Sequence, residues 1–407
     1  MSSPVQSYLE QLHAEILELR DGSVASYIPE LSLVDPDSFG ICMVTMDGVA
    51  YCVGDTEKLF TIQSISKPFI YATALAACGR QQVSAHVGVE PSGEAFNSIS
   101  LDPQTGAPLN PMINAGAIAS TSLVRAPSPE AQWQLIEKSL SRFVGRQVAI
   151  DEAVYRSESA TGARNRAIAW MLKNFGIIEG DPMLPLENYF RQCSVQISCH
   201  DLAFMAATLG NAGVHPLTGE LALPAEHVAP VLSVMATCGM YDYAGSWLYE
   251  VGMPAKSGVG GGIIAVQPGR FGIGIFSPRL DSKGNSVRGI AACRRLSQTL
   301  ELHLFDQTPL QQSPVRSTYR GTERRSRRFR STAEAAVLDP LRSQITVLHA
   351  QGVLDFAAVE NVLARIEQAA IDGAVIILDL GQVSELPPAS AALLHRQAEL
   401  PMSLQQL

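Results

Sequence analysis

The sequence predicts an α+β fold, followed by a small α/β unit near the C-terminus. Apolar segments typical of strands lie at both ends of residues 1–306, and between about 85 and 250 the pattern changes to helices separated by polar loops. Strands that are far apart in the chain must then pair in one antiparallel sheet, with a helical subdomain inserted between them. Residues 336–407 alternate between strand and helix patterns, which indicates a small parallel unit.

The first elements of the large domain are a helix and a hairpin. Residues 5–20 carry apolar side chains at the 3–4 spacing of an amphipathic helix. Residues 39–45 and 50–53 are joined across Asp47-Gly48, a sequence typical of hairpin turns, and predict two paired strands. A helix follows and runs through the small side chains of residues 71–78.

Helices and two strands complete this domain. Apolar runs predict the following elements in order: helices over 202–209 and 228–240, strands over 263–266 and 271–276, and a helix over 289–304 that closes the domain.

The C-terminal part has two sections. Residues 307–335 are rich first in Pro, Gln and Ser and then in Arg, so we expect a solvated linker; the alternative is a patch that binds anions or nucleic acid. The following unit is expected to contain a strand over 345–349, a helix over 356–370, a buried strand over 375–380 and a helix over 389–399.

Composition limits the possible functions. The chain has 407 residues, of which 46% are hydrophobic, and a net charge of −9, which makes general binding of nucleic acid unfavourable. No apolar run reaches the roughly 18 residues that span a bilayer, and the N-terminus lacks a signal-peptide pattern, so we expect a cytoplasmic protein. The seven cysteines are odd in number and lie mostly in apolar segments, as expected for reduced thiols. No cysteine and histidine cluster indicates a metal, and no cofactor is expected.

Ser64 and Lys67 stand at S-x-x-K spacing near the start of a predicted helix. Side chains three residues apart share one face of a helix, about 5–6 Å apart at Cβ, so Lys67 can reach the hydroxyl of Ser64. A neutral lysine can deprotonate a serine nucleophile if burial lowers the pKa of its amine. The alternative is an ordinary helix N-terminus, with Ser64 as its cap and Lys67 on the surface.

A second motif favours the catalytic interpretation. Residues 254–262 read Pro-Ala-Lys-Ser-Gly-Val-Gly-Gly-Gly and lead into an apolar strand, which resembles the K-[ST]-G element of serine β-lactamases and penicillin-binding proteins. In those enzymes the element lines the active site opposite the nucleophile. Glycines there allow backbone N–H groups to approach a substrate closely. The two motifs together indicate a serine acyl-transfer enzyme.

The large domain resembles the serine-dependent glutaminases over its full length. Besides the two motifs, the stretches that carry the resemblance are residues 27–29, 90–93, 110–117 and 238–242. The resemblance implies a β-lactamase-like fold and hydrolysis of L-glutamine to L-glutamate and ammonia. It also implies that Ser64 is the nucleophile and Lys67 the base, with Tyr241 and Tyr27 as further catalytic residues.

The same resemblance implies a set of substrate contacts. They are Tyr27, Gln63, Ser64, Asn114, Glu158, Asn165, Tyr189, Tyr241 and the backbone of Val259. A carboxylate such as Glu158 suits the ammonium of an amino acid, and neutral amides and a phenol suit its carboxylate. The oxyanion would lie between the N–H groups of Ser64 and Val259.

Residues 336–407 are similar to a STAS domain, a small α/β module of anti-sigma antagonists and sulfate transporters. The resemblance rests on residues 376–383 and the helix that follows. Leu386-Pro387 stands where that family often has an aspartate, and the module looks truncated, so we expect a surface for a protein partner or for oligomerisation rather than a phosphorylated switch.

Two alternatives to a glutaminase remain open. A β-lactamase or peptidase of the same fold would need a site that accepts those substrates. A glutamine sensor would bind glutamine tightly without releasing ammonia. For the enzyme we expect a homo-oligomer, a dimer or tetramer, built mainly through residues 1–306.

Overall fold

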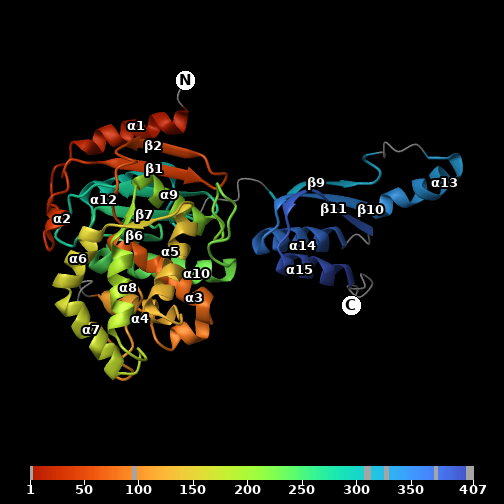
Figure 1. Ribbon diagram of the computed structural model, residues 1–407. Coiled ribbons are helices and arrows are strands. Elements are labelled where there is room, and N and C mark those ends of the chain that lie inside the picture. The colour runs from red at the N-terminus through yellow and green to blue at the C-terminus, as the bar shows by residue number, and fades with distance from the viewer. Residues whose placement is uncertain (1–2, 94–98, 307–312, 325–329, 371–374, 400–407) are drawn as a thin grey trace. The chain divides into compact units, whose positions relative to one another are not determined.

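The computed structural model describes residues 3–93, 99–306, 313–324, 330–370 and 375–399 (Figure 1). The chain divides into two compact units, Met1–Asp306 and Gln307–Leu407, which are described separately below. In the described segments, no helix combines the length and the apolar character needed to cross a membrane. All seven cysteines are free thiols.

The first unit is built on a five-stranded antiparallel sheet. Its strands are β1 (Gly40–Thr45), β2 (Ala50–Gly54), β6 (Ala255–Ser257), β7 (Gly262–Gln267) and β8 (Phe271–Phe276), in the order β2-β1-β8-β7-β6. The predicted hairpin is confirmed, because Ile41 pairs with Val53 and Met43 with Tyr51. The pairing of β1 with β8 joins segments more than 200 residues apart, as the α+β prediction requires.

Helices cover both faces of this sheet (Figure 1). On one face, α1 (Pro4–Leu17) and α12 (Val287–Leu300) share an apolar core with the strands. On the other face, α9 (Cys199–Gly210) packs closely against β8. Two glycines of β8 permit this contact, since a Cβ atom on Gly272 would lie 2.1 Å from the backbone nitrogen of Ala207, and Gly274 is similarly restricted.

The helical part of the first unit surrounds a small sheet. Its helices are α3 (Ser66–Ser84), α4 (Asn114–Leu123), α5 (Pro129–Val144), α6 (Glu152–Thr161), α7 (Ala163–Asn174), α8 (Met183–Cys193), α10 (Ala225–Cys238) and α11 (Ala244–Glu250), with a short α2 (Pro29–Ser32). The small sheet has the order β3-β5-β4, from β3 (Phe60–Thr61), β4 (Ala149–Ile150) and β5 (Val195–Ile197). Strand β3 leads directly into the S-x-x-K segment.

The second unit contains a three-stranded sheet with the order β11-β10-β9. Strand β10 (Ile345–Val353) pairs in parallel with β11 (Val375–Glu385) and antiparallel with β9 (Val315–Arg320). The helices are α13 (Thr332–Leu341), α14 (Phe356–Ala370) and α15 (Pro388–Glu399). Helix α14 buries one apolar stripe in the core of this unit, as its amphipathic pattern predicts.

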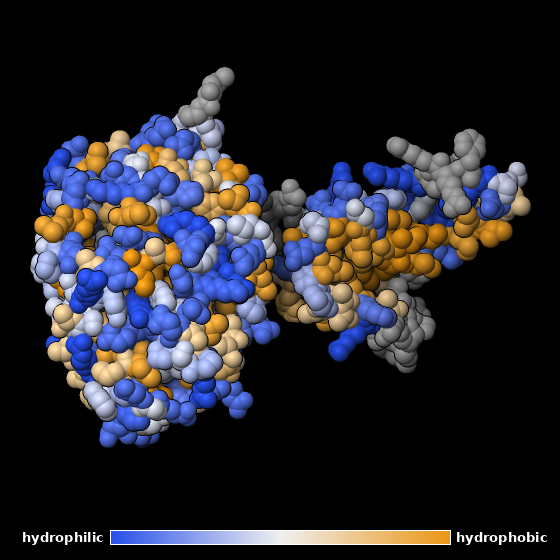
Figure 2. All heavy atoms as spheres, viewed as in Figure 1, coloured by the Kyte–Doolittle hydropathy of each residue, from blue (hydrophilic) through white to orange (hydrophobic). Residues whose placement is uncertain are grey.

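Two predictions for this unit are wrong. Part of the segment expected to be a linker forms strand β9. Its side chains alternate between partly buried and exposed positions, as in a strand with one covered face, and its arginines are exposed. Residues 375–380 do not form a buried strand: β11 is at the sheet edge, and Val375 and Ile377 are 60% and 48% exposed. Figure 2 shows apolar surface over this unit. Helix α13 also begins inside the expected linker, at Thr332. Within that linker, residues 307–312 and 325–329 lie outside the described residues, as do residues 400–407.

Candidate active site

Ser64 and Lys67 lie at the junction between the small sheet and α3. Ser64 is in a short 3-10 helix, η1 (Gln63–Ile65), and α3 begins at Ser66. Gln63 has a φ of 51°, a strained conformation for a residue other than glycine, and the hydroxyl of Ser66 donates to its carbonyl oxygen at 2.8 Å. The side chain of Lys67 is fully buried, so the alternative of a surface lysine is wrong.

The amine of Lys67 has two acceptors. Its Nζ donates to Oδ1 of Asn114 at 2.7 Å and to the carbonyl oxygen of Met112 at 3.2 Å. Burial lowers the pKa of Lys67 to about 8. About a tenth of the amine is therefore uncharged at pH 7, far more than for a lysine with its usual pKa.

Tyr241 connects Ser64 to the K-S-G element. It begins the 3-10 helix η2 (Tyr241–Tyr243), with a φ of 57°, and its hydroxyl donates to the carbonyl oxygen of Ser257 at 2.9 Å. Burial raises the pKa of Tyr241, and a hydrogen bond between its side chain and Ser64 acts in the opposite direction. Tyr241 is thus a neutral phenol that lies against Ser64.

The loop from β6 to β7 carries Val259 and packs on the segment before Ser64. A Cβ atom on Gly260 would lie 2.6 Å from the carbonyl oxygen of Thr61, and one on Gly258 would lie 3.0 Å from that of Ile62. Only glycine allows the two backbones to come this close. The K-S-G loop and the segment before Ser64 are therefore in close contact.

A buried carboxylate is linked through Tyr27 to Gln63, the residue before Ser64. Glu158 of α6 accepts a hydrogen bond from the hydroxyl of Tyr27 at 2.6 Å, and that hydroxyl is also 3.2 Å from Oε1 of Gln63. Burial raises the pKa of Glu158, and Glu30 adds repulsion. Across the described ranges, no lysine, arginine or histidine forms an ion pair with Glu158. This carboxylate would therefore be stabilised by a bound cation.

Neutral donors complete the constellation. Nδ2 of Asn114 donates to Oδ1 of Asn165 at 3.0 Å, so α4 and α7 bring the two amides together beside Lys67. Tyr189 of α8 is buried, and burial raises the pKa of its phenol, with Cys193 and Glu158 as further causes. The fold thus gathers the predicted site residues, which come from eight separate segments, in one region.

Two buried side chains in this region were not predicted as site residues. Lys256 of the K-S-G element has its Nζ 4.0 Å from the ring centroid of Tyr241. Cys193 lies one helical turn after Tyr189 and interacts with it and with Ser66; burial raises the pKa of this thiol to about 12. The sequence offered a signal for each: Lys256 belongs to the K-S-G motif, and Cys193 follows Tyr189 at i+4 spacing. In the described ranges, no group of three or more histidine, cysteine or acidic side chains is arranged to hold a metal.

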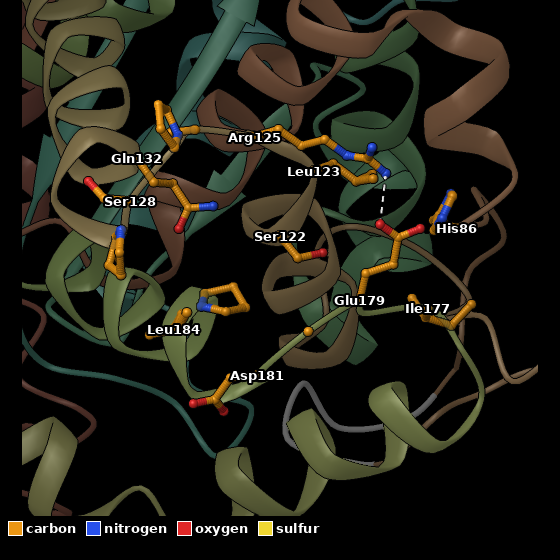
Figure 3. Close-up of a pocket in the computed structure, with 15 residues that line it drawn as sticks. His86, Ser122, Leu123, Arg125, Ser128, Gln132, Ile177, Glu179, Asp181 and Leu184 are labelled. Atoms are coloured by element: carbon orange, nitrogen blue, oxygen red, sulfur yellow. Dashed lines mark hydrogen bonds and ion pairs between the residues drawn. The ribbon is translucent and has the colours of Figure 1, made fainter.

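One cavity of the first unit borders this region, and another lies at the far end of α4. A cavity of about 250 Å³ is lined by Tyr241, Met112 and Cys238, among others. A larger one of about 340 Å³ contains the Arg125–Glu179 ion pair and is lined by the C-terminal end of α4 (Figure 3). Asn114 begins α4, and a ten-residue helix is about 15 Å long, so the larger cavity is remote from Ser64.

Comparison with known proteins agrees with this geometry. A protein-family model described as Glutaminase matches residues 22–305. The chain belongs to the glutaminase family. The glutaminase of Trichormus variabilis is 53% identical over 304 residues, which cover 75% of this chain and 91% of that protein.

Other relatives extend into the second unit. Glutaminase 2 of Bradyrhizobium diazoefficiens is 45% identical over 391 residues, which cover 96% of this chain. The chain spans 62% of the length of that relative. A crystal structure of Mglu in its glutamate form has a TM-score of 0.82 and 38% identity, and the match covers 98% of this chain and 96% of Mglu. Both units of the chain therefore have counterparts in Glutaminase 2 of Bradyrhizobium diazoefficiens and in Mglu.

Proposed function

We propose that this protein hydrolyses L-glutamine to L-glutamate and ammonia through an acyl-enzyme on Ser64. The observation that carries the proposal is the environment of Lys67, whose amine is fully buried, has a pKa of about 8 and lies one helical turn from a buried serine. An uncharged amine in that place is a competent general base. The family membership supports glutamine as the substrate.

The contacts of Lys67 leave room for this role. An uncharged amine has two hydrogens and one lone pair. Asn114 and Met112 can accept both hydrogens, which leaves the lone pair of Nζ for the hydroxyl proton of Ser64. With both hydrogens donated, the lone pair is the part of the amine that can accept a proton.

The reaction then proceeds in two balanced steps. Ser64 Oγ attacks the side-chain amide carbon of glutamine as its proton moves to Lys67, and the N–H groups of Ser64 and Val259 stabilise the oxyanion. Tyr241 relays a proton to the departing nitrogen, so that ammonia leaves and an ester remains. Lys67 then takes a proton from a water molecule, which attacks the ester, and this step releases glutamate and restores Ser64.

The polar groups around Ser64 account for recognition of an amino acid. The carboxylate of Glu158 binds the ammonium of the substrate. Tyr27 and Gln63 hold the Glu158 side chain in place. Asn114, Asn165 and Tyr189 donate to the carboxylate of the substrate. We assign the first unit to the β-lactamase-like fold, but the buried Glu158 favours a small zwitterion over a β-lactam or a peptide. Hydrolysis of a penicillin in place of glutamine would favour the alternative.

We assign the second unit to the STAS-like modules, because β10, α14, β11 and α15 follow one another with a parallel strand pair. The exposed apolar residues of β11 fit a surface for a protein partner or for another copy of the chain. The homo-oligomer is expected to form mainly through the first unit. Seven free cysteines fit a reducing cytoplasmic location.

The pH dependence of ammonia release tests the proposal. Lys67 acts only when it is uncharged, so a pKa of about 8 predicts that kcat/KM rises about tenfold per pH unit below neutrality and levels off above about pH 8 to 9. The measurement is initial rates with glutamine between pH 6 and 9.5. A profile without this limb would contradict Lys67 as the base, and absence of ammonia at every pH would contradict the function.

A further inference from the structure

Cys42 and Cys52 stand directly opposite each other in the main sheet. They pair across β1 and β2 in the antiparallel register, and both side chains pack in the apolar layer between the sheet and α9. Cys42 is buried, whereas Cys52 is only partly buried and lies on an edge strand of the sheet (Figure 1). The proposed reaction assigns no role to either thiol.

The hydrogen bonds of the hairpin show how close these two side chains are. At one end, the N–H of Thr45 donates to the carbonyl oxygen of Val49 at 3.0 Å. At the other end, the N–H of Asp55 donates to the carbonyl oxygen of Phe39 at 2.9 Å. Hydrogen-bonded and non-hydrogen-bonded residue pairs alternate along an antiparallel ladder, and the cysteine pair lies three residues from each of these bonds. It is therefore a non-hydrogen-bonded pair, in which the Cα atoms approach to about 4.5 Å, within the range that a disulfide spans.

The two thiols also interact with each other. Cys42 donates a hydrogen bond to Cys52, which lowers the pKa of Cys52 although burial opposes the change. The side chain of Thr56 acts in the same direction as Cys42. A thiolate is the form of cysteine that reacts with oxidants, so the more accessible thiol of the pair is also the one that ionises more readily. A reactive thiol beside a second thiol is typical of cysteines that form disulfides reversibly.

We propose that Cys42 and Cys52 are a modification site, at which hydrogen peroxide converts the two thiols into a reversible disulfide. The sulfur of Cys52 attacks one oxygen of the peroxide, the O–O bond breaks, and a sulfenic acid on Cys52 and one water are formed. The sulfur of Cys42 then attacks the sulfur of Cys52, so that an S–S bond forms, the S–O bond breaks and a second water leaves. The two thiols lose two electrons and two protons in total, and a dithiol reductant restores them by thiol–disulfide exchange.

The test is peptide mass spectrometry on the full-length protein, before and after treatment with hydrogen peroxide. Remaining thiols are alkylated in denaturant, and a protease that cuts before aspartate separates the two cysteines at Asp47. We expect a pair of peptides linked through Cys42 and Cys52 after oxidation, and its loss after treatment with dithiothreitol. Cys78→Ser is the matched control, because Cys78 is also partly buried but its thiol contacts the carbonyl oxygen of Ala74 at 3.1 Å. This variant should form the same linked pair.

A second variant tests the order of the two steps. Cys42→Ala removes the thiol that closes the disulfide, so peroxide should leave a sulfenic acid on Cys52, which dimedone traps. The wild-type result decides the inference even if this variant does not fold. Two thiols that remain open to alkylation after peroxide would overturn it, and so would a disulfide between Cys42 and Cys199, whose thiol lies nearby. Because neither readout uses glutamine, failure of this inference leaves the proposed function standing, and failure of the proposed function leaves this inference standing.

Discussion

Replacing Ser64 by alanine is expected to lower kcat for glutamine by about 10⁴-fold or more, the scale of loss when a serine hydrolase loses its nucleophile. The substitution removes one oxygen from a buried residue, so the fold should persist. The residues proposed to bind the substrate remain, so glutamine or glutamate should still bind. The measurement is ammonia release, with binding followed by calorimetry.

Ser120→Ala is the matched control for this change. Ser120 is also buried, and its hydroxyl donates within α4 to the carbonyl oxygen of Gly116 at 2.7 Å. This control also removes one buried hydroxyl oxygen, but at a position outside the proposed site, so the variant should retain most activity. If Ser64→Ala kept a kcat within tenfold of the wild type, Ser64 could not be the nucleophile.

Replacing Glu158 by glutamine is expected to reduce kcat/KM at least about 30-fold, mainly through KM. The change removes the negative charge that would pair with the substrate ammonium in a buried site, and the loss of one partner from such a pair costs about 2–5 kcal/mol. Glutamine keeps the size of the side chain and can still contact Tyr27. Steady-state kinetics with glutamine measures the effect.

The control for this prediction is Glu187→Gln. Glu187 is a partly buried carboxylate of α8 that, like Glu158, accepts a hydrogen bond from a tyrosine hydroxyl, that of Tyr155 at 3.0 Å. It lies outside the proposed substrate contacts and should not change KM. An unchanged KM in Glu158→Gln would assign the ammonium to a different group.

Much of the fold could be predicted because burial leaves periodic patterns. The apolar runs at 263–266 and 271–276 give strands β7 and β8 almost residue for residue. The failures have a common cause, since a pattern reports hydrophobicity and not the neighbours of an element. Residues 375–380 are apolar but lie at a sheet edge. Residues 315–320 form a strand in which partly buried side chains alternate with exposed ones, and both of its arginines are exposed.

The candidate site was predicted as a set of residues, but its geometry was not. Spacing along a helix placed Lys67 near Ser64. It could not show that the amine is directed by Asn114 and Met112, which are distant in sequence. The left-handed backbone at Gln63 and Tyr241 also has no sequence signal, since neither residue type favours it. Contacts between remote segments therefore decide the chemistry.

Rapid-quench mass spectrometry can detect the proposed acyl-enzyme on Ser64 itself. Wild-type protein mixed with saturating glutamine and quenched in acid should carry one glutamyl group, located on the peptide that contains Ser64, and the Ser64→Ala variant should carry none. Because an ester is stable in acid, the adduct should survive digestion. Either of two results would rule out an acyl-enzyme on Ser64. One is ammonia release without any adduct at quench times shorter than one turnover, and the other is an adduct on another residue.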